Sequence, residues 1–77
     1  MKVLSKVELK ELKTKYAVGS RVKLVLMNDP YANILAPGDR GTVISVDDIG
    51  TIHVRWDCGS SLGIVYGEDL CELLESF

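Results

Sequence analysis

Apolar and polar side chains alternate strictly in the middle of the chain. Ile52, Val54 and Trp56 are separated by polar residues, so one face of this segment is apolar and the other is hydrated. The segment lies within residues 41–64, where turn-forming residues precede and follow it. The pattern predicts three consecutive β-strands joined by two tight turns, with an apolar face that must be buried.

The two predicted turns differ in whether a glycine takes up the positive φ that a tight hairpin needs. At 47–50, Gly50 is expected to supply the positive φ of a tight turn. The second turn is predicted to be a two-residue type I′ turn, with Cys58 in the position that favours asparagine and Gly59 after it. Cys58 would then hold a left-handed conformation, so Cys58→Asn is predicted to stabilise the protein by about 0.5–1 kcal/mol.

An amphipathic helix is predicted at residues 5–16. Ser5 and Glu8 have the spacing of a capping box at its start. Its apolar stripe at helical spacing consists of Leu9, Leu12 and Tyr16. So short a helix is not stable alone in water, so the stripe must pack on the open end of the same domain or on a second copy of the chain.

An alternating strand is predicted at residues 21–26. Val22, Leu24 and Leu26 are expected to face the core, and the basic residues between them to face solvent. A loop of about ten residues follows, which is longer than usual between paired strands. Long loops on small barrels often carry the ligand site.

The strand that begins at Arg40 departs from regular alternation. Val43 and Val46 both look like core residues, although their spacing places them on opposite faces of a flat strand. A β-bulge near Ser45 would turn both inward. The remaining predicted elements are a strand at 61–65, a helical turn at 66–70 and a last strand at 71–74.

A capped helix followed by five short strands predicts a mostly-β fold, a small five-stranded SH3-like barrel with one N-terminal α-helix. We expect a single domain over residues 1–77, with the helix at 5–16 and the barrel at 18–74. The motifs that carry a family resemblance are Tyr16-x-x-Gly19-x-Arg21-Val22, Met27-x-Asp29-Pro30-Tyr31, Ile52-His53-Val54-x-Trp56-Asp57-x-Gly59-Ser60 and Tyr66-Gly67-x-Asp69. Together they resemble the small bacterial domain-of-unknown-function family numbered four-three-one-four. The resemblance implies an origin in Gram-positive bacteria, their phages or mobile elements, and it implies no established activity and no catalytic residues.

Charge is distributed unevenly along the chain, although the net charge is only −2. Residues 1–25 contain seven Lys or Arg and two acidic residues, a balance of +5. Residues 26–77 contain two Arg and nine acidic residues, a balance of −7. The basic half is either a solvated helix or a weak electrostatic footprint for a nucleic acid or an acidic partner.

Composition argues against membrane and metal-binding roles. No apolar run approaches the roughly 20 residues that span a bilayer, and the charged N-terminus lacks the apolar core of a signal peptide. We therefore expect a cytoplasmic protein without a membrane partner. Cys58 and Cys71 are expected to be free thiols whose spacing fits no zinc motif, even with His53. We expect no metal and no cofactor.

Catalysis is not expected from these residues. The only candidate base is His53, on the hydrated face of a strand. Cys58 has acidic neighbours, which disfavour a thiolate, and the aspartates lie mostly in turns, where they have a structural role. No glycine-rich run opens a helix as a phosphate-binding loop does. The sequence therefore predicts a non-catalytic interaction module.

Two interaction surfaces are predicted. SH3-type peptide sites use aromatic side chains from the long first loop and from the segment before the last strand, and nearby carboxylates would suit a basic ligand. The predicted protein- or peptide-binding surface is Asp29, Tyr31, Asp47, Asp48 and Tyr66. The alternative is a nucleic-acid-binding face of Arg21, Lys23, Arg40 and Arg55, which the nine acidic residues on the same barrel disfavour. Self-association through the N-terminal helix, giving a homodimer, is a further possibility.

Overall fold

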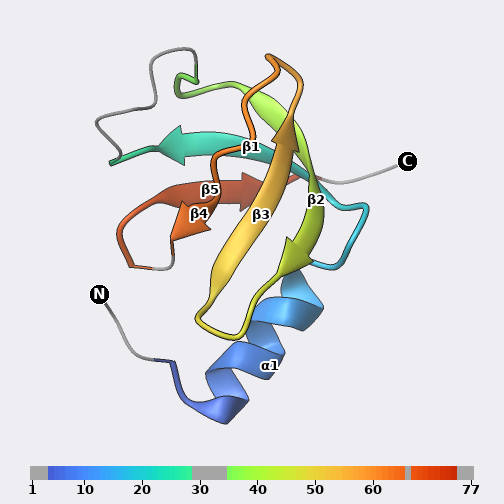
Figure 1. The fold of residues 1–77 in the computed structure, drawn as a ribbon, viewed down its shortest axis with the longest axis vertical. Coiled ribbons are helices and arrows are strands. Elements are labelled where there is room, and N and C mark those ends of the chain that lie inside the picture. The colour runs from blue at the N-terminus through green and yellow to red at the C-terminus, as the bar shows by residue number, and fades with distance from the viewer. Residues whose placement is uncertain (1–3, 29–34, 66, 75–77) are drawn as a thin grey trace.

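One helix and five strands form an SH3-like barrel. The computed structural model describes residues 4–28, 35–65 and 67–74 of the chain. Its elements are α1 (Lys6–Lys15), β1 (Arg21–Leu26), β2 (Arg40–Val46), β3 (Thr51–Trp56), β4 (Ile64–Val65) and β5 (Leu70–Leu73). The strands pair antiparallel in one sheet, in the order β4-β3-β2-β1-β5, and α1 lies beside the end of the barrel where β2 turns into β3 (Figure 1). The predicted fold class is confirmed.

The helix α1 begins with the predicted capping box and packs on its own barrel. The Ser5 hydroxyl accepts from the Glu8 amide at 3.1 Å, and the Glu8 carboxylate accepts from the Ser5 amide at 3.2 Å. Leu12 and Tyr16 are each 8% exposed and belong to the barrel core. The Tyr16 hydroxyl donates to the Cys71 carbonyl of β5 at 3.5 Å. Of the two alternatives for the apolar stripe, the structure therefore shows packing within the chain.

Trp56 is the largest fully buried side chain of the core. Its Nε1 donates to the Leu62 carbonyl at 2.8 Å. Gly41 lies directly opposite on β2, and a Cβ there would meet the Arg55 carbonyl at 2.8 Å and Cε3 of Trp56 at 3.0 Å. The other fully buried residues are Val22, Leu24, Val43 and Val54. The expectation that Trp56 is a core residue is confirmed.

The turn between β2 and β3 has one glycine with positive φ. The Asp47 carbonyl accepts from the Gly50 amide at 3.1 Å, and the Asp47 amide donates to the Thr51 carbonyl at 3.0 Å. Gly50 has φ of 87°. This is a type I turn followed by a bulge glycine, a frequent three-residue hairpin loop.

The turn after β3 has the same geometry, which corrects the predicted type I′ turn. The Trp56 carbonyl accepts from the Gly59 amide at 3.0 Å, and the Trp56 amide donates to the Ser60 carbonyl at 3.1 Å. Gly59 has φ of 97°, whereas Cys58, like every other non-glycine residue that the structure describes, does not have positive φ. The extra loop residue places the left-handed conformation on glycine, so Cys58 carries no strain and the predicted gain from Cys58→Asn loses its cause.

Two β-bulges redirect side chains. The β2–β3 register shifts between Val43 and Ser45, so the predicted bulge is confirmed. Val43 is buried and Val46 packs against the core. The β1–β5 register also shifts, after Leu24, and Leu26 is 54% exposed. The expectation that Leu26 faces the core is wrong, because this second bulge interrupts the alternation.

The segment around β4 differs from the expectation in length and type. Strand β4 covers only Ile64–Val65, since the preceding loop is tied to Trp56 through the Leu62 carbonyl. The described part of the connection to β5 is a turn in which the Val65 carbonyl accepts from the amides of Glu68 and Asp69. Gly67 there has φ of 87°, so the predicted helical turn is wrong.

The two substitutions in the turn after β3 are expected to behave differently. Gly59→Ala would force a Cβ into the left-handed region and should lower the free energy of unfolding by about 1–2 kcal/mol. Cys58→Asn should change it by less than about 0.5 kcal/mol, as is usual for a surface position without strain. Chemical denaturation of both variants measures the difference. A stabilised Cys58→Asn together with a neutral Gly59→Ala would contradict this turn geometry.

Candidate functional site

The predicted peptide-binding surface is described only in part. Asp29, Tyr31 and Tyr66 lie outside the described residues. Asp47 and Asp48 lie in the β2–β3 turn beside α1 (Figure 1). Asp48 Oδ1 lies 2.8 Å from Nζ of Lys13 on α1. This ion pair joins the turn to the helix.

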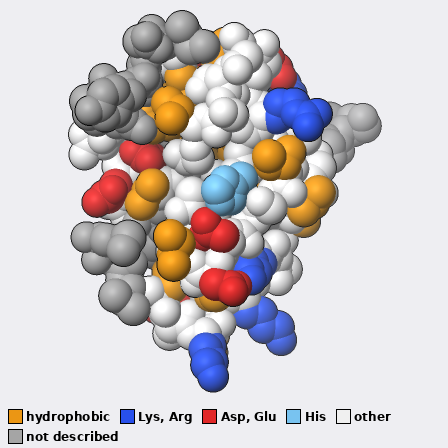
Figure 2. Space-filling view, in the orientation of Figure 1, with side chains coloured by type: hydrophobic (Ala, Val, Ile, Leu, Met, Phe, Trp, Pro, Cys, Tyr) orange, Lys and Arg blue, Asp and Glu red, His pale blue; other side chains and the backbone are white. Residues whose placement is uncertain are grey.

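Asp47 organises its own turn. Its carboxylate accepts from the amides of Ile49 at 3.1 Å and Thr51 at 2.9 Å, and its Oδ2 lies 2.9 Å from Nε2 of His53. Burial raises the pKa of Asp47, but the hydrogen bonds from His53 and from the two amides outweigh it and lower that pKa below its ordinary value. Figure 2 shows His53, the only histidine, at the surface with acidic side chains beside it.

The four basic residues of the nucleic-acid alternative lie on the outer face of the sheet. Lys23 pairs with Arg40 across β1 and β2. Arg21 lies opposite Thr42, which in turn lies opposite Arg55. Side chains directly opposite one another in an antiparallel pair share a face. The fold therefore brings these four residues together, as the sequence analysis anticipated.

Acidic residues are interleaved with this basic face. Nη1 of Arg21 donates to Asp57 at 2.9 Å and to the Thr42 hydroxyl at 3.0 Å. Lys23 Nζ lies 3.0 Å from Glu72 Oε1. The hydrogen bonds from Arg21 keep the pKa of Asp57 below its ordinary value. The charge asymmetry along the chain is thus partly cancelled in the fold, because basic residues of the N-terminal part pair with acidic residues of the barrel.

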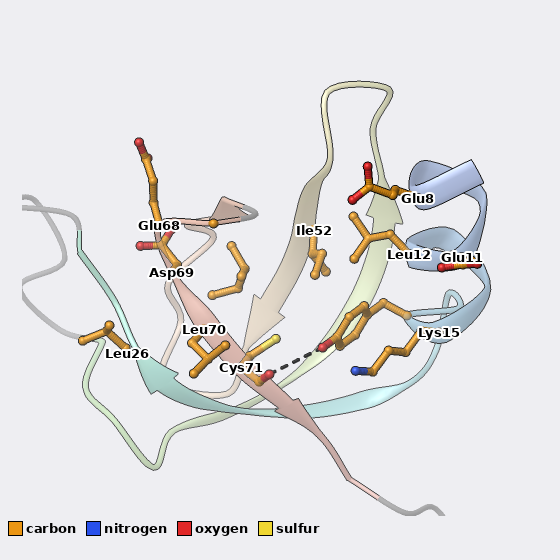
Figure 3. Close-up of a pocket in the computed structure, with 13 residues that line it drawn as sticks. Glu8, Glu11, Leu12, Lys15, Leu26, Ile52, Glu68, Asp69, Leu70 and Cys71 are labelled. Atoms are coloured by element: carbon orange, nitrogen blue, oxygen red, sulfur yellow. Dashed lines mark hydrogen bonds between the residues drawn. The ribbon is translucent and has the colours of Figure 1, made fainter. Parts of the chain in front are cut away.

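A groove lies between α1 and the segment that leads into β5. Its volume is about 630 Å³, within the range of ligand-binding clefts. Apolar and aromatic groups form its floor: Leu12, Tyr16, Ile52, Ile64, Leu70 and Cys71. Its charged residues are Glu8, Glu11, Lys15, Glu68 and Asp69. Figure 3 shows residues of α1 facing those of β5 across the groove.

The floor of the groove is held by the contact between α1 and β5. The hydrogen bond from Tyr16 to the Cys71 carbonyl crosses it (Figure 3). Burial raises the pKa of Tyr16, and burial also raises the pKa of the Cys71 thiol. Both groups therefore stay protonated near neutral pH, and the floor is uncharged.

Asp69 is a fixed charge at the edge of the groove. Its Oδ1 accepts from the Asn28 amide at 2.8 Å and its Oδ2 accepts from the Val65 amide at 2.9 Å. These two bonds tie the end of β1 and the end of β4 to the turn before β5. The acidic rim is therefore built on a well-anchored turn.

Two leucines extend the apolar floor toward solvent. Leu26 of β1 and Leu70 of β5 are cross-strand partners, and both line the groove. They are 54% and 55% exposed. Two large exposed apolar side chains that lie opposite one another, next to an apolar cleft, are typical of a contact surface.

Sequence reasoning missed this groove. Its two walls lie more than 50 residues apart in the chain, and only packing of α1 on the barrel brings them together. The sequence contained one signal of the groove. Glu8 and Glu11 precede Leu12 on the predicted helix, and Glu68 and Asp69 precede Leu70. Both segments place acidic residues beside an apolar residue that has to be buried or bound.

Comparison with known protein families agrees with the family resemblance that the sequence motifs indicated. The family model described as "Domain of unknown function (DUF4314)" matches residues 5–74. The chain belongs to the DUF4314 family. No curated protein and no solved structure matched this DUF4314 chain. The family description names no activity.

Membrane-spanning helices and metal-binding clusters are absent from the described part of this DUF4314 protein. No described helix is long and apolar enough to cross a membrane. Among the described residues, no three His, Cys, Asp or Glu side chains converge as a metal site would require.

Acid unfolding of this DUF4314 protein is expected to depend on Asp57. Because the folded-state pKa of Asp57 lies below its unfolded value of about 3.9, the charged carboxylate stabilises the fold above that pH. This stability is lost as pH falls through the lower folded-state pKa. Asp57→Asn should therefore have a lower Tm than the wild type at pH 7. Below about pH 4, its Tm should fall less steeply with decreasing pH than that of the wild type.

Asp48→Asn is the matched control for the loss of a surface carboxylate. It removes the ion pair between Asp48 of the β2–β3 turn and Lys13 of α1. Thermal melts of the three proteins across the acid range make the comparison. Wild-type and Asp57→Asn curves that stay parallel below pH 4 would contradict the contribution assigned to Asp57.

Proposed function

We propose that this protein is a small, non-catalytic interaction module that binds a protein or peptide partner in the groove between α1 and β5. The observation that carries the proposal is a groove of about 630 Å³ with an apolar floor and two half-exposed leucines at its edge. Exposed Leu26 and Leu70 continue this floor outward. We further propose that it acts in the cytoplasm as part of a phage-associated or mobile-element system.

The groove has the composition of a binding site. Fully burying one Leu-sized side chain of a partner on the floor would contribute about 1.5–3 kcal/mol. A charged rim around such a floor fixes orientation and discriminates between partners more than it adds affinity. This division of roles is usual for interfaces in which a few apolar anchors supply most of the binding energy.

A non-catalytic role is supported by the state of the reactive groups near the groove. The Cys71 thiol lines it, and burial keeps that thiol protonated, which makes it a poor nucleophile. Nε2 of His53 lies against Asp47 on the outer surface, and His53 is absent from the groove lining. A base and a nucleophile in the described residues thus lie at different sites.

Leu70→Ala is expected to weaken partner binding without unfolding the protein. Its side chain is 55% exposed, so truncation should cost little stability while removing an anchor worth about 1–2 kcal/mol, a five- to thirtyfold loss of affinity. Pull-down from lysate of the native host followed by cross-link mapping finds the partner and its contact site, and titration with the purified partner measures the loss.

Ile49→Ala is the matched control, since Ile49 is 64% exposed in the β2–β3 turn and does not line the groove. It should bind as the wild type does. Cross-links that map to the outer face of the sheet, with equal affinity for both variants, would contradict the proposal.

Nucleic-acid binding is the second candidate function, and the observation that favours it is the shared face of Arg21, Lys23, Arg40 and Arg55. Only phosphate contacts would supply affinity there, so binding should weaken steeply with salt. Arg40→Ala and Arg55→Ala leave the Arg21–Asp57 and Lys23–Glu72 pairs in place and test it directly. Fluorescent single-stranded DNA or RNA that binds at low salt, and less well to these variants, would favour this candidate. An unchanged signal at low salt would remove it.

A further inference from the structure

We infer that the partner enters the groove as an extended segment that pairs with the free edge of β5 as an added β-strand. The inference rests on the proposed function and specifies the conformation and the side-chain pattern of the partner. It follows from the state of the two terminal strands of the sheet and from the position of the groove beside them.

The groove lies at the open side of the sheet. Strands β4 and β5 stand at the two ends of the order β4-β3-β2-β1-β5, and no ladder joins them within the described residues. The groove is lined by Ile64 of β4 and by Leu70 and Cys71 of β5 (Figure 3). A segment bound there lies beside terminal strands, whose outward backbone groups decide whether it can pair with them.

The outer edge of β4 is already occupied by the chain itself. The Val65 amide donates to Oδ2 of Asp69 at 2.9 Å. The Val65 carbonyl accepts from the amides of Glu68 at 3.1 Å and Asp69 at 2.9 Å. In an antiparallel ladder the neighbouring residue, Ile64, directs its groups toward β3 instead. The described strand β4 therefore offers no free main-chain group to a further strand.

The outer edge of β5 is set by its ladder with β1. The Leu74 amide donates to the Arg21 carbonyl at 2.8 Å, and the register places Glu72 in the next hydrogen-bonded position of this ladder. Alternate residues of an antiparallel strand bond to the same neighbour. Cys71 and Leu73 therefore direct their amides and carbonyls away from β1, toward the free edge.

One of these outward groups has a partner in the described part of the chain. The Cys71 carbonyl accepts from the Tyr16 hydroxyl at 3.5 Å, which is long for an O–H···O bond. The Cys71 amide and both main-chain groups of Leu73 bond to none of the described residues. A row of unpaired amides and carbonyls is a template for another strand, and proteins usually protect it. The contrast with β4 identifies β5 as the strand that receives the occupant.

The same edge determines the side-chain pattern of the occupant. Cys71 and Leu73 lie on one side of β5, and Cys71 is buried, so this side looks toward the core. In an added antiparallel strand, residues opposite these two place their side chains on that same side. They would meet the apolar floor, which includes Ile52 and Ile64, while the residues between them point to solvent. The occupant is therefore a segment in which apolar and polar residues alternate.

Titration of ¹⁵N-labelled protein with two short synthetic peptides tests the inference. In the first, valine alternates with threonine, which favours an extended chain. The second contains leucine at helical spacing among alanine and glutamine, which favours a helix. The extended peptide should shift the amide resonances of Cys71 and Leu73 and slow their hydrogen exchange, and the helical peptide should not. In the free protein the Leu73 amide should exchange faster than the Glu72 amide, which bonds to β1.

Two N-methylated forms of the extended peptide test the main-chain pairing. Methyl groups on the valine amides and methyl groups on the threonine amides block opposite edges of the same strand. In an antiparallel addition the valine amides face β5, so the first form should lose binding and the second should retain it. The reverse result would assign a parallel strand to the same edge. Equal affinity of the two forms, whether retained or lost, would reject strand addition.

A matched pair of protein variants tests the edge of β5 itself. Leu73→Pro removes an amide that takes no part in the ladder with β1, and proline is tolerated on edge strands in this orientation. It should bind the extended peptide about three- to tenfold more weakly than Leu73→Ala, which loses the same side chain but keeps the amide. Circular dichroism and thermal melts verify that both variants fold. If Leu73→Pro unfolds, the methylated peptides decide the result.

Each other outcome overturns the inference in a recognisable way. A Leu73 amide that exchanges as slowly as Glu72 in the free protein would show that the edge is already paired. Groove resonances that shift with the helical peptide alone would reject strand addition and leave the proposed function standing. No shift with either peptide would also reject it, and the proposed function would then be decided by the Leu70→Ala result alone. Protection of Leu73 that rises with protein concentration, without peptide, would show that a second copy of the chain is the occupant.

Discussion

The packing of Trp56 over Gly41 is the contact on which the rest of the structure depends. The indole is 1% exposed, and it covers a glycine because any side chain there would meet the neighbouring backbone and ring. This contact joins β2 to β3, and the bond from Nε1 to the Leu62 carbonyl draws the following loop against the same ring. Strand β4 is left with two residues, Ile64 and Val65, which pair with Ile52 and Thr51 of β3.

The groove lies between α1 and the turn that follows this short strand. Helix α1 packs Leu12 and Tyr16 against the barrel core, and the hydrogen bond from Tyr16 to Cys71 joins it to β5. The helix covers the core only in part, and the space between its apolar stripe and the turn before β5 stays open. The apolar stripe of α1 and the floor of the groove thus belong to the same hydrophobic core.

Much of the fold could be predicted because its signals are local. The capping box at Ser5, the alternation around Trp56 and the bulge near Ser45 each depend on a few neighbouring residues. Predictions that depended on packing were less successful. The bulge after Leu24 turns Leu26 outward. The loop at Cys58 has three residues where two were predicted, and the positive φ therefore falls on Gly59. The groove could not be predicted, since it exists only where two distant segments meet. A shared face of the four basic residues was predicted only on the condition that their strands are neighbours, and the pairing of β1, β2 and β3 meets that condition.

The groove exists in a single chain only if α1 packs on the barrel of its own chain. Nuclear Overhauser effects measured on an equal mixture of ¹³C-labelled and unlabelled protein, filtered to separate intramolecular from intermolecular contacts, test this most directly. We expect contacts from the Tyr16 ring to Cys71 and from the Leu12 methyl groups to Gly50 in the intramolecular spectrum, independent of protein concentration. The same contacts found only in the intermolecular spectrum would contradict the account, because α1 would then belong to a neighbouring molecule and the groove would not exist in the single chain.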